Sequence, residues 1–342
     1  MYDAPVKIDL RTASRLSVAP MMDWTDRHCR YFHRCLSRHV TLYTEMVTAP
    51  ALVRGQALHL LRFDPAEQPV VLQLGGSDPA ELARATELGW DAGYREINLN
   101  CGCPSDRVQS GCFGAVLMEQ PARVAEICQA MIAASPARIT VKCRIGVDHQ
   151  TPEDVLPRFL ETLARAGVGH VIIHARKAWL SGLSPKDNRE IPPLNHDLVL
   201  AMKRAFPELS ISINGGITSL QQAQAFLDAG LDGVMIGRAA YQRPGDLLLP
   251  ADAAIYGEPG PRNADTTLAA MRPYIAQELA QGTRLASITR HMLGLFAGQP
   301  GARHWRRILS EGAHRPGAGL EVLDTAHDAV REAAGSALAT DG

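Results

Sequence analysis

Short apolar runs recur along roughly the first 240 residues, and each is followed by a segment whose apolar residues lie three or four positions apart. The first pattern is typical of buried strands and the second of amphipathic helices. Several of the helical segments end at a glycine, a common helix terminator. Eight strands are predicted in this way, at 16–20, 41–45, 69–75, 95–100, 138–144, 170–176, 209–215 and 233–238.

Eight alternating strand and helix units are what a parallel (β/α)8 barrel, the TIM barrel, requires. A doubly wound sheet is the alternative, but the first strand is not followed by a glycine-rich dinucleotide fingerprint. We therefore predict an α/β protein built on a TIM barrel.

The strand pattern stops near residue 240, and proline and glycine cluster between 244 and 261. The following segments, such as "LAAMRPYIAQELA" and "ARHWRRILSEGA", have helical periodicity. We predict a barrel domain over 1–245, a linker over 246–261, a small all-helical C-terminal domain over 262–335 and a disordered tail over 336–342.

The composition is that of a globular protein, with 46% hydrophobic and 21% charged residues among 342. No uncharged apolar run approaches the ~18 residues that a membrane span needs. Seven cysteines, an odd number, suit reduced thiols better than a disulfide framework. We expect a cytoplasmic monomer that does not bind membranes.

The net charge is only −1, but arginines are clustered. Arg27, Arg30, Arg34 and Arg38 have the spacing of one helical face, with no acid among them. Between 284 and 315 six arginines accompany a single acid, Glu311. Each cluster is either a solvated face or a binding surface for a polyanion.

Active sites of TIM barrels lie at the C-terminal ends of the strands, often with a phosphate site after strands seven and eight. The two corresponding stretches here are "INGGIT" (213–218) and "IGRAA" (236–240), whose glycines let backbone N–H groups approach an anion. Together they predict a site for a cofactor phosphate.

Polar residues also occupy the ends of other strands. Lys142, within "ITVKC", is an inward salt-bridge partner, a Schiff-base lysine or a cation that stabilises negative charge on a bound ring. His174 is a core residue or a functional one. The amides of Gln73 and Asn100 suit the edge of a flat heterocycle.

The stretch "NLNCGCPSDRVQSGC" raises the question of thiol chemistry. A zinc site is disfavoured because no second pair of ligands accompanies the Cys-x-Cys, and we expect no metal. Cys101, Cys128 and Cys143 follow the apolar pattern and are interpreted as buried core residues. Cys103 lies in the loop beyond the fourth strand and suits a nucleophile or a proton donor, whereas Cys112 is a weaker candidate.

These residues together resemble the tRNA-dihydrouridine synthases, specifically their A-type branch. The similarity extends over about residues 15 to 310 and includes "VAPMMDWTDRHCRYF", "EINLNCGCPSDRVQSGCFGAVLM", "VKCRIGVD", "IIHARKAWLSGLSPKDNREIPPL", "SINGGI", "GVMIGRAAYQ" and "ITRHMLGLFAGQPGARHWRR". The resemblance implies an FMN-binding barrel followed by a small helical domain.

The resemblance also assigns roles to individual residues. Cys103 becomes the general acid. The flavin-binding residues would be Pro20, Met21, Met22, Gln73, Lys142 and His174 around the ring, and Asn214, Gly215, Gly216, Gly237 and Arg238 around the phosphate. The target uracil would meet Asn100 and Arg189. Further contacts with tRNA would come from Arg176, Lys177, Lys186, Arg303, Arg306 and Arg307.

The implied reaction is the reduction of D-loop uridines, at positions twenty and twenty-a, to dihydrouridine. NADPH, or NADH in its place, would reduce FMN, a hydride would pass to carbon 6 of uridine, and Cys103 would protonate carbon 5 while Lys142 stabilises the developing negative charge. The tRNA would be held at its D-loop and elbow, with phosphate contacts from the Arg27–Arg38 face and the helical domain.

Three other functions remain open at this stage. A flavin-dependent oxidoreductase of free pyrimidines, of the dihydroorotate type, would share the barrel and a cysteine acid but has little use for a basic helical domain. A Schiff-base aldolase would use Lys142 without flavin. A non-catalytic tRNA-binding module would not need so many polar strand ends.

Overall fold

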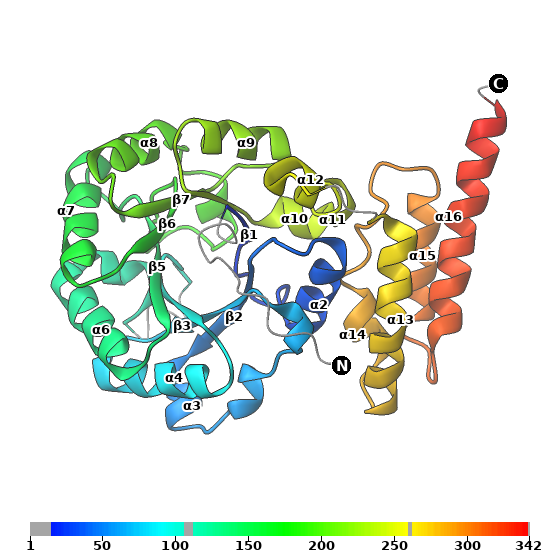
Figure 1. Cartoon of the computed structure of the whole chain (residues 1–342), viewed down its shortest axis with the longest axis horizontal. Coiled ribbons are helices and arrows are strands. Elements are labelled where there is room, and N and C mark those ends of the chain that lie inside the picture. Colours follow the sequence, from blue (N-terminus) through cyan, green and yellow to red (C-terminus); the bar gives the residue numbers. More distant parts are fainter. Residues whose placement is uncertain (1–14, 106–111, 259–261, 341–342) are drawn as a thin grey trace. The chain divides into compact units, whose positions relative to one another are not determined.

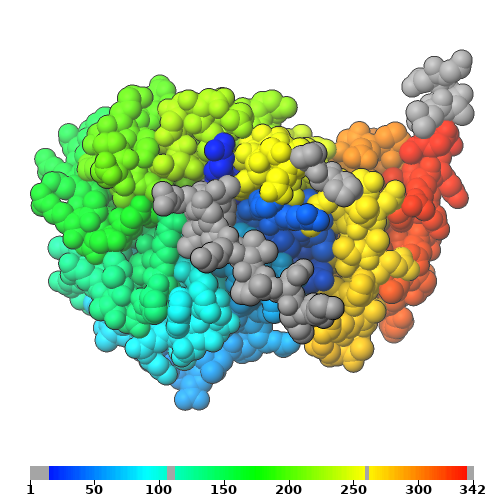
Figure 2. All heavy atoms as spheres, viewed as in Figure 1, coloured from blue at the N-terminus to red at the C-terminus, as the bar shows by residue number. Residues whose placement is uncertain are grey.

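The computed structural model describes residues 15–105, 112–258 and 262–340. Figure 1 colours these residues along the chain, and Figure 2 shows them as spheres, coloured up to residue 336. The chain divides into two compact units. The first holds the chain up to Asp23 together with Thr41–Gly237, and the second holds Trp24–Val40 together with the chain from Arg238 onward.

The first unit is built on parallel strands that follow one another around a ring (Figure 1). Its sheet order is β1-β8-β7-β6-β5-β4-β3-β2, and a parallel bridge from Ser17 to Thr41 links β1 to the start of β2. The prediction of a TIM barrel is confirmed. The strands are β1 (Leu16–Val18), β2 (Leu42–Thr48), β3 (Val70–Gly75), β4 (Glu96–Cys101), β5 (Arg138–Arg144), β6 (His170–His174), β7 (Ser210–Asn214) and β8 (Gly233–Ile236).

Helices between the strands cover the outside of the ring (Figure 1). Three of them begin at a side-chain cap, as when Asp78 accepts a hydrogen bond from the N–H of Glu81 and Pro79 starts the helix. Asn195 and Ser219 cap two others in the same manner. The helices are α3 (Ala49–Val53), α4 (Pro79–Asp91), α6 (Pro121–Ala134), α7 (Pro152–Arg165), α8 (His196–Ala205) and α9 (Leu220–Asp228).

Side chains fill the barrel because alternate strand residues point inward. An apolar cluster is formed by Ala19, Tyr43, Val71, Ile172 and Met235, none more than 6% exposed. The neighbouring strands β4 and β5 instead place polar residues at alternate positions, paired in register from Glu96↔Arg138 through Asn98↔Thr140 to Asn100↔Lys142. The barrel interior therefore contains both an apolar cluster and a row of polar residues on β4 and β5.

The second unit is helical. Helix α2 (Arg27–Leu36), which follows β1 in the chain, belongs to it, and Tyr31 of α2 stacks on Tyr274 with ring centroids 3.9 Å apart. Its other helices are α10 (Arg238–Gln242), α11 (Pro244–Leu247), α12 (Ala251–Tyr256), α13 (Ala264–Ala280), α14 (Leu285–Thr289), α15 (Ala302–Gly312) and α16 (Leu320–Thr340).

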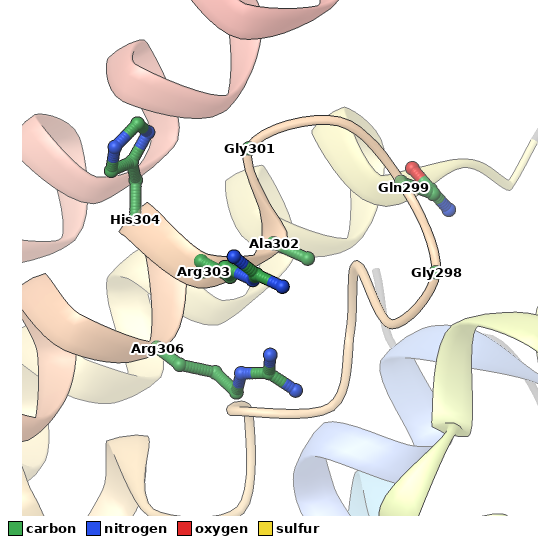
Figure 3. A pocket seen from close by; sticks show the side chains of 7 residues that line it. All are labelled: Gly298, Gln299, Gly301, Ala302, Arg303, His304 and Arg306. Atoms are coloured by element: carbon green, nitrogen blue, oxygen red, sulfur yellow. The ribbon is translucent and has the colours of Figure 1, made fainter.

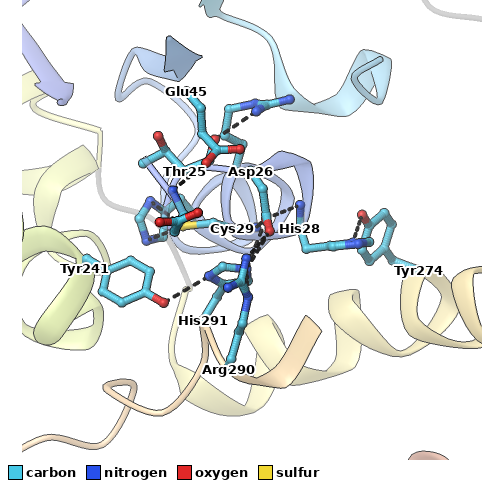
Figure 4. A network of polar contacts seen from close by, with 12 residues as sticks. Thr25, Asp26, His28, Cys29, Glu45, Tyr241, Tyr274, Arg290 and His291 are labelled. Atoms are coloured by element: carbon cyan, nitrogen blue, oxygen red, sulfur yellow. Dashed lines mark hydrogen bonds and ion pairs between the residues drawn. The ribbon is translucent and has the colours of Figure 1, made fainter. Parts of the chain in front are cut away.

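Polar contacts attach α2 to the rest of this unit (Figure 4). Asp26 caps α2 by accepting from the N–H groups of His28 and Cys29, and the same carboxylate pairs with Arg290 at 2.6 Å and with His291 at 3.0 Å. Tyr241 hydrogen-bonds the other nitrogen of the His291 ring at 3.1 Å. One carboxylate thus joins a helix N-terminus to a segment more than 250 residues later in the chain.

The predicted basic face of α2 is wrong for three of its four members. Arg30 and Arg34 are buried, at 4% and 8% exposure, and donate to backbone carbonyls that include those of Thr25 and Val40. Arg27 pairs with Glu278. Arg38 alone among the four is exposed. Helical spacing shows which residues share a face, but not whether that face meets water or other helices.

The proposed domain boundaries stay a prediction. The predicted linker contains α12, and its residues 259–261 lie outside the described part of the chain, as do 341–342 of the predicted tail. Helix α16 runs to Thr340. Across the described residues, none of the helices combines the length and apolar character that crossing a bilayer demands.

Candidate active site

Asn100 organises the loop that carries Cys103. Its Oδ1 accepts hydrogen bonds from the backbone N–H groups of Gly102 and Cys103, both at 3.0 Å, and its Nδ2 donates to Gln73 Oε1 at 2.9 Å. The Cys103 thiol faces Ser105 Oγ at 3.5 Å and is half-buried. The thiol is thereby held just beyond the C-terminal end of β4.

Four other cysteines that the sequence analysis considered differ in their burial. Cys101, Cys128 and Cys143 are completely buried, which confirms their interpretation as core residues. Burial raises the pKa of Cys128 and of Cys143 to about 12, so neither thiol is a nucleophile at neutral pH. Cys112 is exposed.

Lys142 extends from β5 at the C-terminal end of the barrel strands, which is called the mouth below. Its Nζ donates to Asn214 Oδ1 at 3.1 Å, and Asn214 in turn donates to the backbone carbonyl of Met235. Burial, reinforced by the nearby Arg144 guanidinium, lowers the pKa of Lys142 to about 8. Within the described residues Lys142 forms no ion pair, so its charge is not compensated by a carboxylate and can interact with a ligand.

His174 lies at the end of β6, paired in register with Asn214. Burial, and then the positive charges of Arg144 and Lys142, keep the pKa of His174 well below its usual value. The imidazole is therefore neutral at pH 7, and one of its nitrogens is an acceptor.

Two glycines follow β7 with backbone angles that side chains rarely adopt. Gly215 has φ +111° and Gly216 has φ +74°. A Cβ on Gly215 would lie 2.6 Å from His174 Cδ2, and one on Gly216 would lie 2.4 Å from Leu194 Cδ1. Bare backbone is therefore required here, as in loops that approach an anion closely.

The remaining predicted cofactor residues lie near the ends of other strands. Pro20, Met21 and Met22 come one residue after the end of β1, and the Met22 side chain is 55% exposed. Gly237 directly follows β8, whereas Arg238 begins α10 in the second unit.

Arg144 and Asn188 were not assigned a role from the sequence, yet both shape the site. The buried Arg144 guanidinium donates to the carbonyls of Gly102, Lys177 and Asn188, each at 3.0–3.1 Å. Asn188 is fully buried and bonds both backbone groups of Trp179. Arg144 thus joins the Cys103 loop to the long loop after β6, a role that sequence spacing could not reveal.

The predicted tRNA contacts in that long loop differ in their surroundings. Arg176 donates to the carbonyls of Glu190 and Pro192. Lys177 donates to the Gln150 carbonyl at 3.0 Å and lies over the Trp179 ring. Lys186 and Arg189 are exposed. No observation tests these assignments, which stay predictions.

The second unit carries its own basic site at α15. A hollow of about 530 Å³ is lined by the loop at Gly298–Gly301 and by Arg303, His304 and Arg306. Figure 3 shows the Arg303 and Arg306 side chains extending from α15 toward the same space. Both are exposed, as is Arg307, so this face can reach a polyanion.

No group of three or more histidine, cysteine or acidic side chains suited to a metal ion occurs in the part of the chain that the structure describes.

Comparisons with known proteins give a consistent picture. The family model described as dihydrouridine synthase matches residues 17–334. The tRNA-dihydrouridine(20/20a) synthase of Vibrio cholerae is 55% identical over 91% of this chain and 95% of that protein. The proteins of the same name from Escherichia coli and Xanthomonas axonopodis are also 55% identical, over 94% and 91% of this chain and 93% and 92% of theirs.

Among solved structures, an old yellow enzyme homologue from Zymomonas mobilis superposes with a TM-score of 0.52 at 12% identity. The match covers 74% of this chain and 92% of that one. At this identity the likeness concerns the barrel fold alone.

Proposed function

The chain belongs to the dihydrouridine synthase family, and we propose that it reduces uridines 20 and 20a in the D-loop of tRNA to 5,6-dihydrouridine, using FMN and NADPH. The names of its 55% identical relatives support the substrate and its positions. The observation that carries the chemistry is the convergence of the Cys103 loop, Lys142 and the Gly215 turn at one end of a single barrel.

The residues present fit FMN. The turn at Gly215 and Gly216 has the bare backbone that a phosphate needs, and a Cβ would fill it. Lys142 on β5 offers an uncompensated cation, and Gln73 on β3 offers a side-chain amide, groups that suit the polar edge of a flavin ring. When bound, FMN reduced by NADPH would supply the hydride for carbon 6 of uridine.

Cys103 would supply the proton for carbon 5. Its thiol acts as a donor toward Ser105 Oγ, and two hydrogen bonds from backbone N–H groups to Asn100 hold the loop backbone that carries it. Lys142, protonated at neutral pH, would stabilise the negative charge that develops on the uracil ring before protonation.

We further propose that the helical unit holds tRNA through the exposed arginines of α15, while the uridine is turned out of its loop into the barrel mouth. Because its substrate would be tRNA, we expect the enzyme to work in the cytoplasm. The Lys186 side chain, exposed on the loop after β6, would meet the tRNA backbone near the target, and the exposed Arg189 of the same loop would meet the target uracil.

The test is a pair of half-reactions. The purified protein is reduced by NADPH without oxygen until the visible flavin band bleaches, and tRNA lacking dihydrouridine is then added. Return of the band together with new dihydrouridine at positions 20 and 20a is the expected result. Reoxidation by free uridine but not by tRNA would indicate a small-pyrimidine oxidoreductase, and no flavin band after addition of FMN would refute a flavoenzyme.

A further inference from the structure

Five polar side chains form one continuous chain of hydrogen bonds through the barrel interior. Asn100 Nδ2 donates to Gln73 Oε1 at 2.9 Å, Gln73 Nε2 donates to Asn98 Oδ1 at 2.9 Å, and Asn98 Nδ2 donates to Thr140 Oγ1 at 3.0 Å. Thr140 Oγ1 then donates to Glu96 Oε1 at 3.2 Å. None of these residues is more than 8% exposed.

Every bond in this chain points the same way, and the direction is imposed from both ends. At the mouth, two backbone N–H groups, which can only donate, occupy Asn100 Oδ1 and turn its NH2 group toward Gln73. At the far end Glu96, when ionised, can only accept. Its carboxylate also lies 3.5 Å from Arg138 and is hydrogen-bonded by Tyr43.

The direction decides what Asn100 can offer a ligand. A side-chain amide has two N–H donors and two acceptor lone pairs on its oxygen. Both lone pairs are used by the Cys103 loop and one N–H is used by Gln73. The remaining group of Asn100 is a single N–H donor, which pairs with a carbonyl oxygen and not with another donor.

We propose that Thr140 and Glu96 are positioning residues, which act through Asn98 and Gln73 to hold the Asn100 oxygen on the Cys103 loop and its free N–H toward a carbonyl of the substrate ring. The inference rests on the proposed function for the identity of that ring. The sequence pattern behind these hydrogen bonds is the alternation in "EINLN" and "RITVK". It places Glu96, Asn98 and Asn100 on the same face as Thr140 of the next strand.

The decisive pair of variants is Thr140→Val, which removes the hydroxyl at nearly constant volume, and Thr140→Ser, which keeps it. Ser212→Ala is the matched control. Ser212 is a buried hydroxyl of the same barrel that hydrogen-bonds His170 at 2.8 Å, and it takes no part in the hydrogen bonds that link Glu96 to Asn100. Thr140→Ala, which cannot overpack the site, replaces Thr140→Val if that variant does not fold.

The first readout needs neither flavin nor tRNA. Iodoacetamide alkylation of Cys103 is followed by peptide mass spectrometry, with the exposed Cys112 as internal reference. Losing the Thr140 hydroxyl leaves a buried amide unsatisfied and frees Asn100 to turn, so Cys103 should react about tenfold faster in Thr140→Val, with Cys112 unchanged. Thr140→Ser and Ser212→Ala should match the wild type.

The second readout separates the half-reactions. Reoxidation of the reduced protein by tRNA should slow about tenfold in Thr140→Val, and by more than reduction by NADPH slows, because Asn100 would face the substrate ring whereas Gln73 would contact only the flavin. Equal behaviour of Thr140→Val and Ser212→Ala in both readouts would overturn the proposal. If tRNA does not reoxidise even the wild type, the proposed function fails. The alkylation rates still decide whether the hydrogen bonds from Thr140 to Asn100 position Cys103.

Discussion

The backbone nitrogen of Cys103 lies 3.0 Å from the side-chain oxygen of Asn100. This hydrogen bond joins the loop to Asn100, a polar residue near the end of β4. The position of the loop that carries the thiol is therefore set by the barrel and not by the loop alone. Loops placed in this way by a rigid scaffold commonly carry catalytic groups.

Cys103→Ala should therefore abolish proton donation without disturbing the fold. We expect dihydrouridine formation to fall by about 10²–10⁴-fold, the usual range for loss of a general acid, while NADPH still bleaches the flavin band. Cys112→Ala is the control, since that thiol is exposed, and should remain active. A fully active Cys103→Ala with an inactive Cys112→Ala would reverse the assignment.

Gly215→Ala tests the phosphate turn. The new methyl would meet His174 Cδ2 at 2.6 Å on a backbone with φ +111°, so we expect a loss of about 1–3 kcal/mol in the free energy of unfolding and weaker retention of FMN. Gly169→Ala is the matched control, because nothing lies within 4 Å of its Cβ, and should stay within about 0.5 kcal/mol. Denaturant unfolding and the flavin-to-protein absorbance ratio measure the two effects.

The outcome for the fold shows what the sequence can predict. Strand positions were recovered closely because buried parallel strands are nearly continuous apolar runs, as in "HVIIH" of β6. The burial of Arg30 and Arg34 was missed because their acceptors are backbone carbonyls, which carry no sequence signal. The partner of Arg27 is Glu278, 251 residues away, and only the tertiary fold brings them together.

The same limit applies to the site. The strand ends indicated Cys103, Lys142 and the Gly215 turn because these residue types are unusual in their positions. The three carbonyls that Arg144 holds depend on the conformations of two loops, which residue types alone do not determine.

Lys142 should make stability depend on pH in a defined direction. Its pKa is about 8 in the folded protein against 10.5 ordinarily, so between these values the unfolded chain binds more protons. The free energy of unfolding therefore rises with pH across this window, and below pH 8 the contribution of Lys142 to it is constant. Relative to Lys142→Met, the flavin-free wild type should gain up to about 3 kcal/mol from pH 8 to 10.5. Urea unfolding of both proteins checks this, and a constant difference would contradict it.

The arginines of α15 should contribute to tRNA binding through phosphate contacts. We expect the double variant Arg303→Ser and Arg306→Ser to bind tRNA more weakly, with a slope of log Kd against log salt concentration less steep by about 2. Reduction of the flavin by NADPH should be unaffected. Arg158→Ser, an exposed arginine on α7, is the control. An unchanged salt slope in the double variant would remove α15 from the binding surface.

Asp26→Asn isolates the charge of Asp26 from its role as a helix cap, because asparagine is an equally good N-cap. Burial raises the pKa of Asp26, but the hydrogen bond and the charge of His291, together with a hydrogen bond from Arg290, outweigh it. The pKa of Asp26 is therefore well below its usual value. A lowered carboxylate pKa stabilises the fold above the unfolded value of about 3.8, and this contribution is lost as the pH falls.

The wild type should therefore exceed Asp26→Asn in stability by about 1–2 kcal/mol at pH 7, and the difference should shrink below about pH 4. Asp26→Ala should lose about 1 kcal/mol more, because it also removes the cap of α2. Asp328→Asn, an exposed aspartate on α16, should change stability by less than about 0.5 kcal/mol. Thermal unfolding at several pH values distinguishes these cases, and a difference that persists unchanged at pH 2 would show that shape, not charge, makes Asp26 important.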